Sequence, residues 1–159
     1  MLSKQEIRRS ARTIIIDEEG KIAVLEVKNG DYYVIPGGGI EDDESLEDCA
    51  IREALEEAAC GVELIIKLGE SEFESPVFKE TINHSVCFLA KKINDCKEPA
   101  FTGEEMRNRF KLLWLPIDAA ILLFESIKSS IPFEIELNNR DLEFIKIAKE
   151  YGCKNNLYK

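Results

Sequence analysis

The stretch that decides the fold is IPGGGIEDDESLEDCAIREALEEAACGVE, residues 35–63. Three consecutive glycines precede nine acidic residues between positions 41 and 57, and Arg52 is the one base among them. Ser45 is a suitable helix N-cap with Asp48 three residues further on, so a helix is predicted from about 46 to 59. Such a density of like charge needs a physical explanation, because like-charged neighbours on a helix repel.

The predicted helix gathers three carboxylates on one face. Glu53, Glu56 and Glu57 are spaced i, i+3 and i+4, which places their Cβ atoms about 5–6 Å apart. The residues expected to pack on a sheet from the opposite side are Ile51, Leu55 and Ala58. Two interpretations follow: a solvated acidic face, or a site for a hard divalent cation such as Mg²⁺, which prefers oxygen ligands and removes the repulsion.

The spacing of these residues resembles the Nudix box, Gly-x5-Glu-x7-Arg-Glu-U-x-Glu-Glu-x-Gly-U, where U is a bulky apolar residue. The fixed residues that match are Gly38, Glu44, Arg52, Glu53, Glu56 and Glu57. So long a match is far more specific than a short glycine motif. The resemblance favours the divalent-cation interpretation of the acidic helix.

The chain departs from the box at four places. Ala59 stands where the family has its late glycine, with Gly61 two residues on, and Asp43 replaces a glycine found in many members. Ala54 and Cys60 are small for apolar positions. None of these is a presumed metal ligand. The end of the helix is left open: either Gly61 ends it late, or Ala59 takes the left-handed conformation.

The resemblance implies a hydrolase that uses Mg²⁺, with Mn²⁺ as the alternative ion. Water would attack phosphorus in a nucleoside diphosphate-X compound, either a nucleoside triphosphate or an ADP-ribose-like substrate. By motif position, Glu53, Glu56 and Glu57 are expected to be catalytic and to bind the metal. The backbone carbonyl of Gly37 or Gly38 is expected to be a further ligand.

The remaining candidate site residues have supporting roles. Arg52 is expected to pair with Glu44 and to orient the catalytic carboxylates, with a phosphate contact as the alternative. Glu104 and Glu105 resemble the downstream loop acid of several family members, although an ordinary polar loop explains them equally well. The one histidine, His84, lies in a predicted strand, which favours a carboxylate as the general base.

The box does not identify the substrate. ADP-ribose hydrolases of the family often carry a proline 15–16 residues beyond the box, and Pro76 lies 16 residues after Cys60. Loops use proline for other reasons, and a MutT-like nucleoside triphosphatase fits equally well. The alternative from another class is a non-catalytic Nudix-fold module that senses a nucleotide or binds a protein; such modules typically lose box carboxylates, which are all present here.

Residues outside the box have simpler structural explanations. Arg9 and Arg12 could meet phosphates, but a surface position is the simpler interpretation. Tyr32, Tyr33 and Trp114 could stack on a base, but packing in the core or on the sheet accounts for each of them. The substrate-binding residues are therefore left unassigned.

The element pattern predicts a mixed sheet with helices packed on it. The expected strands are 11–17, 21–27, 32–36, 61–73, 83–93 and 110–116, and the expected helices are 46–59, 117–128 and 139–152. Strands and helices do not alternate as regular βαβ units. Together with the resemblance, this indicates one Nudix domain over residues 1–159, an α/β fold built as an α/β/α sandwich.

Composition narrows the class of partner. The net charge of −10 argues against binding a nucleic acid polymer, and no apolar run is long enough to span a membrane. The five cysteines form no CxxC pair, which favours reduced thiols. The N-terminal segment does not have a secretory pattern, so a cytoplasmic location is expected. Family members are often dimers, which makes a homodimer an expectation.

Overall fold

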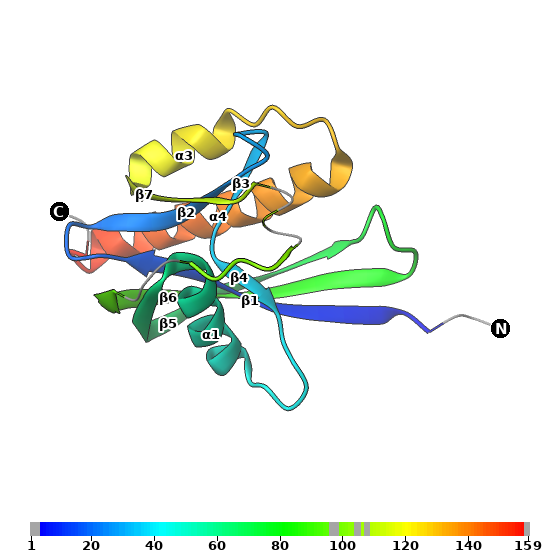
Figure 1. Cartoon of the computed structure of the whole chain (residues 1–159), viewed down its shortest axis with the longest axis horizontal. Helices are drawn as coiled ribbons and strands as arrows, with labels where there is room; N and C mark the ends of the chain where they lie inside the picture. Colours follow the sequence, from blue (N-terminus) through cyan, green and yellow to red (C-terminus); the bar gives the residue numbers. More distant parts are fainter. Residues whose placement is uncertain (1–3, 96–98, 104–105, 107–108, 158–159) are drawn as a thin grey trace.

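The structure is a computed structural model, and it describes residues 4–95, 99–103, 106 and 109–157. Within them, seven strands form one sheet: β1 (Glu6–Ile16), β2 (Lys21–Val27), β3 (Tyr32–Val34), β4 (Gly37–Gly39), β5 (Cys60–Glu74), β6 (Thr81–Asp95) and β7 (Lys111–Pro116). The order is β3-β2-β1-β6-β5, with β4 beside β1 and β7 beside β2 (Figure 1). Because β1 and β6 are parallel and the other pairs antiparallel, the predicted mixed sheet is confirmed.

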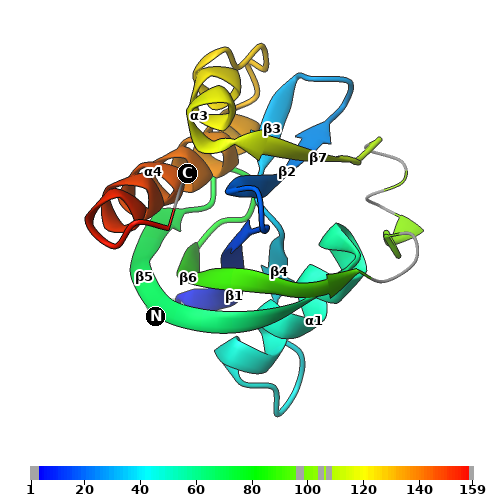
Figure 2. The same cartoon turned by 90° about the vertical axis from the view of Figure 1, so that its left-hand side faces the viewer.

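Helices cover both faces of the sheet: α1 (Leu46–Ala58) on one, and α3 (Ile117–Glu125) with α4 (Pro132–Lys154) on the other (Figure 2). Successive side chains of a strand point to opposite faces. In β1, Ile14 and Ile16 pack with α3 and α4, while Ala11 and Ile15 belong to the clusters under α1. The α/β/α arrangement follows from this alternation.

Helix α1 begins as the sequence predicts and ends in a strained conformation. The Ser45 Oγ accepts a hydrogen bond from the Asp48 backbone N at 3.0 Å. At the other end Ala59 adopts the left-handed conformation, with φ 52° and ψ 39°, and Gly61 already lies in β5. Asp43 is also left-handed, with φ 63°. Both positions where the family often has glycine therefore keep the backbone that glycine favours.

The packing of α1 corrects one expectation. Ile51 and Leu55 do not pack on the sheet, since 42% and 49% of their surface is exposed. The residues of α1 that are buried with little or no exposure are Cys49, Ala50, Ala54 and Ala58, together with Glu53 and Glu57. Small side chains allow the helix to approach the sheet closely, and this rotation brings the carboxylates inward.

One strand and several element boundaries also differ from those predicted. Strand β4 was not expected; its three glycines pair with Ser10–Arg12 of β1. Strand β1 begins at Glu6 instead of 11, because its first half is held by the parallel neighbour β6. Helix α4 begins at Pro132 instead of 139, since proline is well suited to the first helical turn.

Helix α4 also contributes Leu142, Phe144, Ile145 and Ala148 to the same apolar core as β1 and β2. It thereby supplies a wall beside the glycine strand. No helix in the described ranges combines the length and the apolar character that a membrane crossing requires.

Candidate active site

The glycine strand β4 lies against the carboxylates of α1. The Gly37 backbone N donates a hydrogen bond to the Glu57 Oε1 at 2.8 Å. A Cβ at Gly37 would overlap the carbonyl oxygen of Ala11, and a Cβ at Gly38 would overlap the carboxylate of Glu53. Glycine is therefore required at position 37 by the close approach of β1, and at position 38 by the contact with Glu53, which is only 8% exposed.

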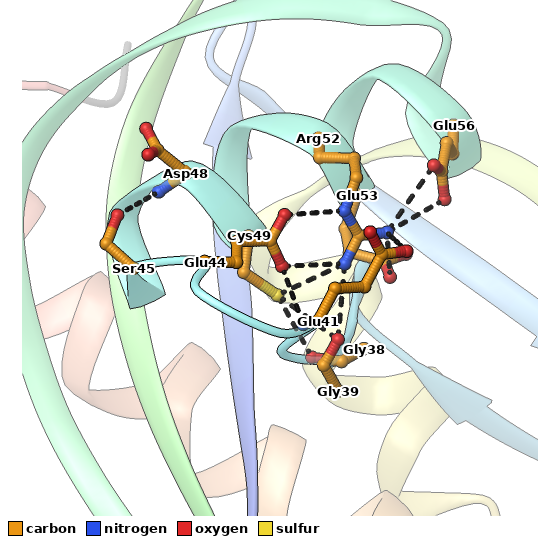
Figure 3. Close-up of polar contacts among 10 residues, drawn as sticks. All are labelled: Gly38, Gly39, Glu41, Glu44, Ser45, Asp48, Cys49, Arg52, Glu53 and Glu56. Atoms are coloured by element: carbon orange, nitrogen blue, oxygen red, sulfur yellow. Dashed lines mark hydrogen bonds and ion pairs between the residues drawn. The ribbon is translucent and has the colours of Figure 1, made fainter.

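Arg52 is the centre of the hydrogen bonds on this helix (Figure 3). Its Nε and Nη2 donate to the two carboxylate oxygens of Glu44 at 2.8 and 3.0 Å. Its Nη1 donates to the Glu53 Oε1 at 2.9 Å and to the Glu56 Oε2 at 3.2 Å. The pairing of Arg52 with Glu44 expected from the box is present, and one guanidinium holds three glutamates in place.

The pKa values of the groups in this cluster shift in the directions that their contacts predict. The hydrogen bonds from Arg52 lower the pKa of Glu44 to about 2. The same pair raises the pKa of Arg52. Burial raises the pKa of Glu53, although Arg52 opposes the shift. A buried carboxylate that is costly to ionise gains from a nearby cation.

The donor set fits a hard divalent cation in chemistry. Two buried carboxylates, Glu53 and Glu57, and the more exposed Glu56 offer oxygen ligands beside the glycine backbone. In the arrangement that the described residues adopt, no three acidic, histidine or cysteine side chains converge closely enough to enclose an ion. In this arrangement the Arg52 Nη1 donates to both Glu53 and Glu56.

Cys49 belongs to the site although the sequence analysis did not single it out. Its Sγ donates to the carbonyl oxygen of Gly38 at 3.3 Å and lies 3.7 Å from the Arg52 Nη2. Burial raises the pKa of Cys49 to about 11, so the group is a neutral thiol that can donate. Its position, three residues before Arg52 on the same helix, was the available signal.

A buried cluster of opposite charges lies behind the glycine strand. The Asp141 carboxylate, fully buried, accepts hydrogen bonds from the Arg12 Nη2 at 3.3 Å and the Arg140 Nε at 2.8 Å. It also accepts a hydrogen bond from the Ile35 backbone N at 2.9 Å. A surface position for Arg12 was wrong, because only 8% of it is exposed.

A cavity of about 210 Å³ opens between β1, β3 and α4, beside the glycines and Glu57. Arg8, Arg9, Arg12 and Arg140 line it together with Tyr32, Phe110 and Phe133. Tyr32 thus reaches the cavity, unlike the other two aromatic candidates: Tyr33 packs against Phe124 and Trp114 lies under the Lys92 ammonium.

The other predicted residues are not part of this cluster. His84 lies on β6, where its Nε2 is 3.4 Å from the Glu70 carboxylate. Glu104 and Glu105 lie outside the described residues. The segment just before them reaches the site, since the Ala100 backbone N donates to the carbonyl oxygen of Glu56 at 2.6 Å.

The α/β/α fold and the acidic helix facing a glycine strand define a Nudix-type domain. The family profile of the NUDIX domain matches residues 6–133, and the chain belongs to this family. Nudix hydrolase 4 of Arabidopsis thaliana is 31% identical over 117 residues, covering 74% of this chain and 51% of its own length. Nudix hydrolase 16, mitochondrial, of the same plant is 32% identical over 108 residues, covering 65% and 59%.

The chain thus spans between half and three fifths of the length of these relatives. Among solved structures, a NUDIX hydrolase from Nitrosomonas europaea superposes with a TM-score of 0.68 at 13% identity, covering 91% of this chain and 90% of that one. At that identity the likeness concerns the fold, and it agrees with the predicted mixed sheet flanked by helices.

Proposed function

We propose that this protein is a Mg²⁺-dependent hydrolase of the pyrophosphate bond in nucleoside diphosphate-X compounds, with Mn²⁺ as an alternative ion. Nucleoside triphosphates and ADP-ribose-like molecules are the substrate classes. The observation that carries the proposal is the complete carboxylate set of α1, two of whose members are buried against the glycine backbone. The shared apolar core of α4 and the sheet supports one domain over the chain.

Glu53, Glu56 and Glu57 would hold the metal, together with the backbone carbonyl of Gly37 or Gly38. When bound, Mg²⁺ supplies charge neutralisation for phosphate oxygens and acidifies a water molecule. One carboxylate of this set accepts the proton of the attacking water, as the distant His84 is engaged with Glu70. The phosphorus–oxygen bond of the leaving phosphate then breaks.

Arg52 and Glu44 position these ligands. The two-pronged pair fixes the guanidinium, which in turn holds Glu53 and Glu56 on the site side of the helix. A cation at this site would compete with Arg52 for the oxygens of Glu56, since the Arg52 Nη1 lies 3.2 and 3.4 Å from them.

The test is turnover of a substrate panel: nucleoside triphosphates, ADP-ribose, sugar nucleotides and diadenosine polyphosphates, each with Mg²⁺, with Mn²⁺ and with EDTA. We expect metal-dependent release of a nucleoside monophosphate. Glu57→Gln should lower the rate about 10²–10³-fold, which is the usual effect of removing one group that stabilises the charge of the transition state in an enzyme. Glu47→Gln is the matched control, because Glu47 is on the same helix but exposed.

A non-catalytic nucleotide-binding module is the alternative. It is favoured by the lack of convergence of three ligand side chains in the described part of the chain. Turnover of no member of the panel, or full activity in Glu57→Gln, would support that alternative and remove the catalytic proposal.

A further inference from the structure

The last strand of the sheet has one edge without a neighbouring strand. β5 stands at the end of the strand order and pairs only with β6 in the described part of the chain. Figure 2 shows it as the outermost strand, with α4 beside it. The backbone N–H and C=O groups along such an edge can pair with a further strand, so an open edge is an interaction surface unless the chain blocks it.

The two halves of β5 differ in how this edge is protected. Register shifts interrupt the pairing with β6 between positions 61 and 69, so residues 61–68 form a bulged half. From Gly69 to Glu74 each residue has one consecutive partner on β6, which makes this the regular half. Bulges twist an edge away from another chain, whereas a regular segment leaves a template for pairing. The regular half is therefore the part of β5 that can accept a strand.

A groove of about 280 Å³ (the β5–α4 groove) lies between the regular half of β5 and helix α4. The helix contributes one stripe of side chains, spaced i, i+4, i+7 and i+11: Glu136, Arg140, Glu143 and Ile147. At 1.5 Å per residue this stripe is about 16 Å long. An extended segment of about five residues covers the same length.

The floor of the β5–α4 groove is apolar. Phe73 of β5 and Phe144 and Ile147 of α4 line it, and 40% of the surface of Ile147 is exposed. The volume is below the ~300–1,000 Å³ of pockets that bury a whole small ligand. Because the groove follows a strand edge, it suits the side chains of an extended peptide, every second one of which points to the same face.

The rim of the groove carries unbalanced negative charge. Glu72 from β5 and Glu136 from α4 line opposite walls; both are exposed, and neither has an ion pair among the described residues. The other two glutamates of the lining are paired with lysines. Arg140 pairs with Asp141 and is only 9% exposed. The rim therefore attracts positive charge, and the net charge of −10 acts in the same direction.

The same charge argues against a second copy of this chain as the occupant. Antiparallel pairing of two β5 edges would bring the glutamates at 70, 72 and 74 of one copy close to those of the other. Like charges opposite each other destabilise a sheet. A basic segment meets no such repulsion, so the rim selects a partner of opposite charge.

We propose that the β5–α4 groove is a docking site for a basic, extended segment of another protein, which adds a strand to the regular half of β5. Its backbone pairs with β5, its alternate apolar side chains lie on the groove floor, and its lysines or arginines lie near Glu72 and Glu136. None of the carboxylates of α1 lines this groove, so the inference does not depend on the proposed hydrolysis.

The experiment titrates the full chain, in EDTA, with the end-blocked peptide Lys-Val-Lys-Val-Lys-Val and follows binding and amide hydrogen exchange by NMR. We expect saturable binding and slower exchange within residues 69–74, with little change in the bulged half. The acidic counterpart Glu-Val-Glu-Val-Glu-Val should bind at least about tenfold more weakly. The basic peptide with every backbone amide N-methylated should not bind, because it cannot donate hydrogen bonds to β5.

Charge reversal tests the two walls separately. Glu72→Lys and Glu136→Lys should each weaken binding of the basic peptide about fivefold at 150 mM salt, where charges more than about 8 Å apart are screened. Glu63→Lys is the matched control, because Glu63 is an exposed glutamate in the bulged half of the same strand and does not line the groove. It should change the affinity less than about twofold.

Several results would overturn the inference: no binding of the basic peptide, equal binding of the acidic or methylated peptide, or equal effects of Glu63→Lys and Glu72→Lys. A dimer of the free chain in which the amides of residues 69–74 are protected would assign the groove to a second copy. Hydrogen exchange of the unaltered chain decides the matter if a variant does not fold. Turnover of the substrate panel, or its absence, changes none of these outcomes.

Discussion

Two charged clusters lie on either side of the glycine strand, and they balance charge in opposite ways. On the carboxylate face of α1, one arginine that is 23% exposed pairs with four glutamates. In the Asp141 cluster, one carboxylate with no exposure serves Arg12 and Arg140. A partly exposed counter-charge can be exchanged for a cation from solution, whereas a sealed one cannot. The Arg52 cluster is thus suited to binding a metal ion, and the Asp141 cluster is suited to stabilising the fold.

The largest effect is expected from a substitution in the buried Asp141 cluster. Asp141→Asn removes the one carboxylate that both buried guanidiniums contact, so we expect a loss of about 3–5 kcal/mol in the free energy of unfolding. Urea denaturation followed by circular dichroism measures it. Asp118→Asn is the matched control: its carboxylate pairs with Lys149 at 2.7 Å but is 73% exposed, and its loss should stay below about 1 kcal/mol. Similar losses in both variants would contradict the distinction.

The next effect concerns the exchangeable cluster. Arg52→Lys cannot hold Glu44 with two donors in a fixed plane, so Glu53 and Glu56 lose their orientation. We expect the Mg²⁺ concentration for half-maximal rate to rise about 10–100-fold, as for other residues that orient metal ligands. Glu41→Gln serves as control, because this partner of Arg52 is 3.7 Å away and 70% exposed. An unchanged Mg²⁺ dependence in Arg52→Lys would remove the orienting role.

A smaller effect concerns the end of the acidic helix. Ala59 occupies the left-handed region at a cost of about 1–2 kcal/mol, part of which glycine recovers. Ala59→Gly should therefore raise the free energy of unfolding by about 0.5–1 kcal/mol. Ala58→Gly, one residue earlier inside the helix, should lower it by about 1 kcal/mol. A loss of stability in Ala59→Gly as well as in Ala58→Gly would show that Ala59 carries no strain.

The smallest effect is expected at the start of the acidic segment. Asp43 is also left-handed, but aspartate tolerates this region far better than alanine. Asp43→Gly should change the free energy of unfolding by less than about 0.5 kcal/mol in the same denaturation measurement. A gain as large as that of Ala59→Gly would mean that the two left-handed residues are equally strained.

The carboxylate face could be predicted because its parts are close in the sequence. The Ser45 cap and the spacing of the glutamates follow from helical periodicity within one short segment, and the pairing of Arg52 with Glu44 follows from the resemblance of that segment to the Nudix box. The rotation of the helix did not follow, because Ile51 was placed against the sheet from its position opposite the carboxylates. The sheet instead accommodates small side chains and leaves Ile51 exposed.

The Asp141 cluster could not be predicted because it depends on tertiary pairing. Arg12 and Asp141 are separated by 129 positions, and no local pattern connects them. The glycine strand was missed for a related reason: glycine has low strand propensity, and only its neighbours β1 and α1 make an extended conformation favourable.

The parallel pairing of β1 with β6 has a consequence for how the chain folds during its synthesis. The first strand must find a neighbour whose sequence lies about 75 positions later, and it cannot pair there by a simple hairpin. On a ribosome that adds about 5–20 residues each second, β1 waits several seconds for that neighbour to emerge. Contacts so distant in sequence slow folding, so the edge of β1 that faces β6 stays unpaired during synthesis even after β2 and β4 have emerged.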